Sequence, residues 1–172
     1  MRFDTFSALT AICQRWPFEH GKIIQLLLAI SFDKRRGGYA VENRSSEGVD
    51  LELISDRQKF AIEVKTTEGS QVTIQEKDIS GLQARATADG YTPAIAALQL
   101  QKSADWVIAN ARKLCARDYT PARLSLDSIS ELELLAKNHF EKTVIELRDD
   151  FLLHAGSSPL SYLSEILINE SR

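Results

Sequence analysis

The sequence predicts an α/β fold, a mixed central β-sheet flanked by helices, with a helical C-terminal extension. Residues 18–32 are apolar over a wide arc of a helix, which is typical of a helix that lies across a sheet. Residues 49–54 and 60–65 alternate apolar and polar side chains around a short polar turn, which indicates a β-hairpin. Apolar residues spaced by three and four from residue 128 onward indicate the C-terminal helices.

Local signals place the other elements. A first helix ends at Trp16-Pro17, because proline disfavours helical backbone at the residue before it. Asp78 is the expected N-cap of a helix that Asp89-Gly90 ends. The expected order is helices at 5–15 and 18–32, strands at 39–42, 49–54, 60–65 and 72–74, a helix at 79–88, strands at 93–100 and 106–108, and helices from 128 to about 154 and from 159.

Two segments carry further signals. The run from Trp106 predicts a strand, with a helix through Lys113 as the alternative. Ser128 and Glu131 have the spacing of a capping box at the start of the long helix, and Pro159 suits the first position of the last one. We therefore expect a core at residues 1–115 and a helical extension at 116–172 packed on it, as one domain.

Composition limits the class of protein. The chain has 172 residues, of which 44% are hydrophobic, enough for a substantial core. Its net charge of −3 disfavours avid nonspecific DNA binding, although a local basic patch would suffice for a nucleic-acid enzyme. Cys13 and Cys115 lack the spacing of a metal or disulfide motif, and the apolar run at 23–30 is too short to span a bilayer. A cytoplasmic protein without a membrane partner is expected.

The hairpin carries the polar residues that suggest a function. Asp50, Glu63 and Lys65 occupy polar positions of the two strands, and antiparallel pairing can bring them close together. The carboxylates would supply hard oxygen ligands for Mg²⁺, the Val64 carbonyl a further ligand, and Lys65 would position water or neutralise developing charge. Glu19, at the start of the apolar helix, is the candidate for an additional acid. This set predicts metal-dependent hydrolysis of a phosphodiester.

A simpler interpretation exists for the same strand. Glu and Lys often alternate on the outer face of a solvated sheet, where oppositely charged pairs are mildly stabilising. A preceding strand with Asp50, an apolar helix expected over the sheet, and Thr66-Thr67 immediately after the strand favour a site instead. The residues that could contact the DNA backbone are Lys34, Arg35, Arg36, Arg44, Gln75 and Lys77. The basic helix end could equally serve the helix dipole, and Gln75 and Lys77 could be ordinary surface residues.

The order of these motifs resembles the PD-(D/E)XK nuclease superfamily, whose fold is restriction-endonuclease-like, and within it the archaeal-type Holliday-junction resolvases. The resemblance covers roughly residues 18 to 110 and comprises Glu19 in a helix, Gly-Val-Asp50, Ile-Glu63-Val-Lys65, then a helix, an apolar strand and Asp105-Trp106. The sequence departs from the pattern at Val49, which replaces the proline of the first motif, and in its acidic balance.

The resemblance implies a mixed five-stranded sheet flanked by helices and cleavage of DNA with Mg²⁺, for which Mn²⁺ would substitute. It implies Asp50 and Glu63 as metal ligands, Lys65 as the catalytic lysine and Glu19 as the helix acid. Possible branched DNA and a homodimer are the partners it suggests, and the C-terminal helices could recruit a protein. We expect a metal-dependent DNA endonuclease, resolvase-like or restriction-type. The alternative is an inactive nuclease-fold subunit that binds DNA or serves assembly.

Overall fold

The computed structural model describes residues 2–44, 48–100, 105–153 and 158–170. The elements are α1 (Phe3–Arg15), α2 (His20–Phe32), β1 (Ala40–Asn43), β2 (Leu51–Ile54), β3 (Lys59–Thr67), β4 (Val72–Ile74), α3 (Glu76–Asp89), β5 (Thr92–Gln99), β6 (Val107–Asn110), β7 (Arg117–Tyr119), α4 (Pro121–Leu124), the 3₁₀ turn η1 (Ser125–Asp127), α5 (Ser130–Leu153) and α6 (Pro159–Glu170). The predicted mixed α/β fold is confirmed.

Five strands form the central sheet in the order β1-β2-β3-β5-β6. The β3–β5 pair is parallel and the other pairs are antiparallel, so the sheet is mixed. Four of the strands expected from the sequence lie together here, and β6 settles the alternative at Trp106 in favour of a strand. The short β4 pairs instead with β7 in a separate two-stranded sheet.

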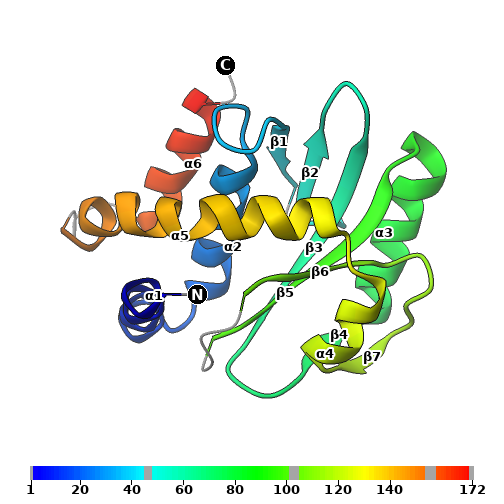
Figure 1. Ribbon diagram of the computed structural model, residues 1–172, viewed down its shortest axis with the longest axis horizontal. Coiled ribbons are helices and arrows are strands. Elements are labelled where there is room, and N and C mark those ends of the chain that lie inside the picture. The colour runs from blue at the N-terminus through cyan, green and yellow to red at the C-terminus, as the bar shows by residue number, and fades with distance from the viewer. Residues whose placement is uncertain (1, 45–47, 101–104, 154–157, 171–172) are drawn as a thin grey trace.

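Helices cover both faces of the central sheet (Figure 1). Helices α1, α2, α5 and α6 lie on one side, and α3 lies on the other, near the small sheet and α4. Each side has its own apolar core: Phe60 and Ile62 of β3 face the first group, whereas Ala61 faces the core that includes Ile79 of α3. The period-two alternation of β3 therefore divides its side chains between two differently covered faces.

Helix α2 is the centre of the larger core. Every residue from Ile23 to Phe32 is buried, and the helix contacts the sheet as well as α5 and α6. A helix that is apolar all round is stable only when it is enclosed in this way. The expectation that this helix packs against the sheet is confirmed, and complete burial of Ile24, Leu27 or Leu28 contributes about 1.5–3 kcal/mol each.

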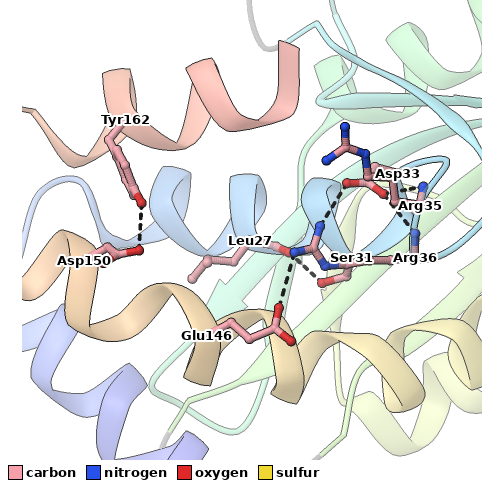
Figure 2. Close-up of polar contacts among 8 residues, drawn as sticks. All are labelled: Leu27, Ser31, Asp33, Arg35, Arg36, Glu146, Asp150 and Tyr162. Atoms are coloured by element: carbon pink, nitrogen blue, oxygen red, sulfur yellow. Dashed lines mark hydrogen bonds and ion pairs between the residues drawn. The ribbon is translucent and has the colours of Figure 1, made fainter. Parts of the chain in front are cut away.

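The C-terminal helices pack on α2, and polar contacts join α6 to α5 and α5 to the segment just after α2 (Figure 2). The Tyr162 hydroxyl of α6 donates to Asp150 of α5 at 3.1 Å. Arg36, just beyond α2, reaches Glu146 of α5 at 3.3 Å. No described helix combines the length and apolar character needed to cross a membrane.

The structure corrects the sequence interpretation at α3 and at β7. Helix α3 begins at Glu76 with Gln75 as its N-cap, and Asp78 is the third helical residue of a capping box rather than the cap. The strand β7 lies in the segment that was expected to be helical. A strand of three residues is too short to show a period of two in the sequence, and it becomes recognisable only through its pairing with β4. The expected end of the long helix near residue 154 lies outside the described residues.

The long helix α5 also starts two residues later than expected, at Ser130. The carboxylate of Glu131 does not serve a capping box with Ser128 in the way the spacing suggested. It accepts hydrogen bonds from the Tyr39 hydroxyl at 2.9 Å and from Gln58 at 2.5 Å, and so links α5 to the sheet. Tertiary partners here outweigh the local signal.

Candidate active site

The candidate site lies where β2 and β3 separate. The two strands pair from Leu51–Ile54 against Lys59–Ile62, and Asp50 extends the pairing by donating its N–H to the Ile62 carbonyl at 3.1 Å. Beyond that point β3 runs on to Thr67. The Val64 N–H donates to Asp50 Oδ2 at 2.8 Å. The Asp50 side chain thus replaces the β2 backbone as a partner of β3, which fixes this carboxylate beside the strand.

Lys65 is held between two carboxylates. Its Nζ lies 2.9 Å from Glu63 Oε1, two residues along β3, and 2.7 Å from Asp78 Oδ2 in the first turn of α3. Alternation along β3 directs Glu63 and Lys65 to the face that α3 covers. We call Asp50, Glu63, Lys65 and Asp78 the carboxylate–lysine cluster.

The cluster is largely shielded from solvent. The side chains of Glu63, Lys65 and Asp78 are 12%, 20% and 2% exposed. An ordinary Glu–Lys pair on a solvated sheet would be open to water, so that interpretation of the β3 pattern is wrong. Buried charges are costly unless they are paired, and removing one partner leaves the other uncompensated, so the members of the cluster depend on one another.

Burial and crowding set the charge of the two carboxylates expected to be ligands. Burial raises the pKa of Glu63 to about 7, and the nearby negative charge of Asp50 adds to the effect, while Lys65 opposes it. Burial also raises the pKa of Asp50, against the opposing effect of the Val64 N–H and of Lys65. Ionising both carboxylates at once is therefore unfavourable, because their negative charges repel each other in a partly buried site.

The other pair in the cluster is mutually stabilised as ions. Burial disfavours the charge of Asp78, but hydrogen bonds from Lys65 and from the Gln75 N–H outweigh it and lower the pKa of Asp78. Burial likewise disfavours the Lys65 ammonium, but its bonds to Asp78 and Glu63 raise the pKa of Lys65 overall. The ammonium–Asp78 pair is thus the firmly ionised part of the cluster.

Close contact between two glycines lets α3 approach the cluster. A Cβ on Gly81 would lie 1.8 Å from the Gly48 carbonyl oxygen, so only glycine fits there. Gly48 itself has φ of +89°, a conformation that other residues rarely adopt. This contact fixes α3 against the turn that leads into Asp50, and Asp78 lies one helical turn before Gly81.

Glu19, the expected helix acid, is the N-cap residue of α2. Its neighbour Gly21 approaches the Thr66 hydroxyl, with 3.6 Å between that oxygen and a Cβ built on the glycine. Thr66 alternates with Lys65, so this end of α2 lies at the face of β3 opposite the cluster. The structure thus brings Asp50, Glu63 and Lys65 together, and the start of α2, which carries Glu19, lies beside Thr66.

The predicted DNA-contacting residues lie in three places: at the start of α3, in the basic segment 34–36 after α2, and at Arg44. Gln75 and Lys77 lie at the N-terminus of α3, and Lys77 is close enough for its charge to lower the pKa of Asp50. The basic segment after α2 is at the far end of that helix from Glu19. Arg44 pairs with Glu42 and lies 3.4 Å from the buried carboxylate of Glu52.

Buried Asp33 organises the basic segment (Figure 2). Its carboxylate accepts hydrogen bonds from the N–H groups of Arg35 and Arg36 at 2.8 and 3.0 Å, and pairs with the Arg36 guanidinium at 3.2 Å. The same guanidinium also pairs with Glu146. Arg36 therefore fastens the end of α2 to α5, while Lys34 and Arg35 remain exposed.

The donor chemistry of the cluster suits a divalent cation such as Mg²⁺. Mg²⁺ is commonly bound through one or two carboxylates and keeps several waters. Asp50 and Glu63 offer such oxygens, and a cation would relieve the repulsion that raises the pKa of Glu63. Within the described ranges, no group of three or more His, Cys, Asp or Glu side chains is arranged to hold a metal.

Comparison with known proteins finds a resemblance in structure. No protein-family model matches the sequence, and no curated protein matches it. The structure resembles that of Hjc, a Holliday junction resolvase from the archaeal hyperthermophile Archaeoglobus fulgidus, with a TM-score of 0.47 and 18% sequence identity. The match covers 56% of this chain and 82% of that one.

Sequence reasoning missed Asp78 as a member of the cluster. An aspartate at the start of a helix is common as a capping residue, so its presence is accounted for without any role in a site. Its contact with Lys65 joins α3 to β3 and depends on how α3 packs. A sequence signal does exist in retrospect: an acid near the start of the helix that follows the Glu-x-Lys strand.

Proposed function

We propose that this protein is a metal-dependent endonuclease that hydrolyses phosphodiester bonds in DNA. The observation that carries the proposal is the buried cluster of Asp50, Glu63 and Lys65 at the separation of β2 and β3. Two crowded carboxylates and an ammonium provide both a cation site and a positive charge for a phosphate. Strongly perturbed acids gathered with a specific charge partner are typical of functional sites.

Asp50 and Glu63 would hold the metal ion, with the Val64 carbonyl as a further ligand. Mg²⁺ would supply a Lewis acid for the phosphoryl oxygens and a lowered pKa for its water, and Mn²⁺ would substitute. Asp50 is oriented for this role by the Val64 N–H. Lys65 is fixed by two carboxylates. Its ammonium would offer a positive charge and hydrogen-bond donors to the attacked phosphate or to the attacking water.

DNA would approach the cluster beside the N-terminus of α3. Lys77 and Gln75 lie there, and backbone N–H groups at a helix start favour a phosphate. Because the chain is acidic overall, affinity would depend on such local positive groups. The sequence resemblance makes branched DNA the first substrate to test, and a homodimer the assembly to look for.

Cleavage of linear, single-stranded and four-way-junction DNA, with Mg²⁺, with Mn²⁺ and with chelator, tests the proposal. Wild type should cut one of these forms only with metal, and Asp50→Asn or Glu63→Gln should abolish cutting while retaining the fold. Lys65→Ala should abolish cutting but leave metal binding largely intact. Asp56→Asn, which removes an exposed acid from the turn between β2 and β3 at the other end of the hairpin, is the matched control and should cut normally.

DNA affinity separates the enzyme from the alternative. The carboxylate variants should bind DNA at least as tightly as wild type, because less negative charge then faces the phosphates. Wild-type protein that binds DNA yet cuts no form with either metal would refute the nuclease. That result would favour the non-catalytic DNA-binding or assembly subunit.

A further inference from the structure

Asp78 contacts the lysine of the proposed site and stands outside the residues assigned to metal or chemistry. Its carboxylate is 2% exposed and lies 2.7 Å from Lys65 Nζ. The same Oδ2 accepts the Gln75 N–H at 2.8 Å, within the capping box of α3. One buried oxygen thus joins the start of a helix to the side chain of a neighbouring strand.

The two partners of Lys65 differ in their other duties. Glu63 lies two residues from Lys65 on the same strand and is also an expected metal ligand. A carboxylate oxygen that binds a metal cation is a poorer partner for an ammonium. Asp78 is held in place by the first turn of α3, and α3 is fixed against Gly48 through Gly81. Asp78 can therefore keep Lys65 in position whether or not Glu63 binds a metal ion.

We propose that Asp78 is a positioning residue that holds the Lys65 ammonium beside Asp50 and Glu63, and retains it there when Glu63 turns to a divalent cation. The inference rests on the proposed metal-dependent function. Lysine carries a flexible four-carbon stem, so an ammonium without a fixed partner would sample many positions. A reacting group displaced by a small distance loses much of its rate advantage.

Asp78→Asn separates this role from helix capping. The amide oxygen of asparagine can still accept the Gln75 N–H, so the start of α3 is preserved, but the negative charge toward Lys65 is lost. Glu76→Gln is the matched control, because it removes one charge from the same helical turn at an exposed position. A conservative variant, Asp78→Glu, keeps the negative charge and should retain part of the positioning of the Lys65 ammonium.

The first measurement uses NMR of the full-length protein with ¹⁵N-labelled lysine side chains, where an ammonium fixed in a buried ion pair gives a resolved signal, assigned by Lys65→Arg. Wild type and Glu76→Gln should keep the Lys65 signal with and without Mg²⁺. Asp78→Asn should keep it without metal, through Glu63, and lose it at saturating Mg²⁺. A Lys65 signal that persists in Asp78→Asn with Mg²⁺ would overturn the proposal, as would a wild-type signal lost on adding Mg²⁺.

The second measurement separates this inference from the proposed activity. Single-turnover cleavage by Asp78→Asn should fall by between about tenfold and about 100-fold with unchanged DNA affinity, since only the position of a reacting group is lost. Absence of cleavage by wild type, with the NMR response as expected, refutes the nuclease and leaves the positioning role intact. If Asp78→Asn does not fold, Asp78→Ser, whose hydroxyl can also accept the Gln75 N–H, takes its place in both measurements.

Discussion

Glu63→Gln should stabilise the folded protein above neutral pH, although it removes an ion pair. In the native state the pKa of Glu63 is raised to about 7 by burial and by Asp50, whereas the ordinary value is 4.5. That difference corresponds to about 3 kcal/mol of folding free energy lost when the carboxyl ionises. Glutamine avoids this cost because it stays neutral.

The sign of the pH dependence follows from proton uptake. Between pH 4.5 and about 7 the folded protein binds a proton at Glu63 that the unfolded chain has released, so stability falls as the pH rises. The stability that protonated Glu63 contributes is fully present below pH 4.5, the pKa of Glu63 in the unfolded chain, and it is lost once the pH has risen above about 7. The advantage of Glu63→Gln should therefore grow across this window.

Urea denaturation of wild type and Glu63→Gln across this pH range measures the effect. The free energy of unfolding of the variant relative to wild type should rise by about 1–3 kcal/mol from the acid to the alkaline end. Added Mg²⁺ should stabilise wild type at the alkaline end and the variant less, because binding to the folded state alone adds stability. A pH-independent difference between the two proteins would refute the assignment of a raised pKa to Glu63.

Three further outcomes follow from the geometry. Gly81→Ala should lower the free energy of unfolding by about 1–3 kcal/mol in a thermal or urea titration, despite the better helix propensity of alanine, because its Cβ meets the Gly48 carbonyl; exposed Ser80→Ala should be nearly neutral. Leu28→Ala should cost about 2–5 kcal/mol in the same assay, and a smaller loss would contradict the close packing of α2. Lys77→Gln should weaken DNA binding and reduce the slope of log affinity against log salt by about 1, whereas an unchanged slope would remove Lys77 from the interface.

The elements that could be predicted from sequence are those whose pattern repeats along the element itself. The apolar arc of α2 and the alternation in β2 and β3 each extend over several residues and depend on burial alone. β7 has three residues, and its pairing with β4 joins segments about 45 positions apart in the sequence. Such a strand exists only because of its partner, so no local signal identifies it.

The same distinction holds for the candidate site. Asp50, Glu63 and Lys65 belong to one hairpin, and the period of two brings them together once the hairpin is accepted. Asp78 and Glu19 depend on how helices pack on the sheet. The start of α3 brings Asp78 into the cluster, whereas the start of α2 lies beside Thr66, whose side chain alternates with that of Lys65. Helix position is a tertiary property that residue spacing within one element does not contain.

The arginines illustrate why a basic residue in a sequence is weak evidence for DNA binding. Arg36 pairs with buried Asp33 and with Glu146, and Arg44 lies beside the buried carboxylate of Glu52. These charges offset buried acids. Using Arg36 for a phosphate would take its guanidinium from Asp33, at a cost of about 3–5 kcal/mol. Glu52 would keep its ion pair with Arg85 at 2.7 Å if Arg44 were drawn away. Lys77 is exposed at the start of α3, beside the carboxylate–lysine cluster, so it can meet a phosphate without such a cost. Position relative to the cluster, more than the number of basic residues, therefore decides where DNA would bind.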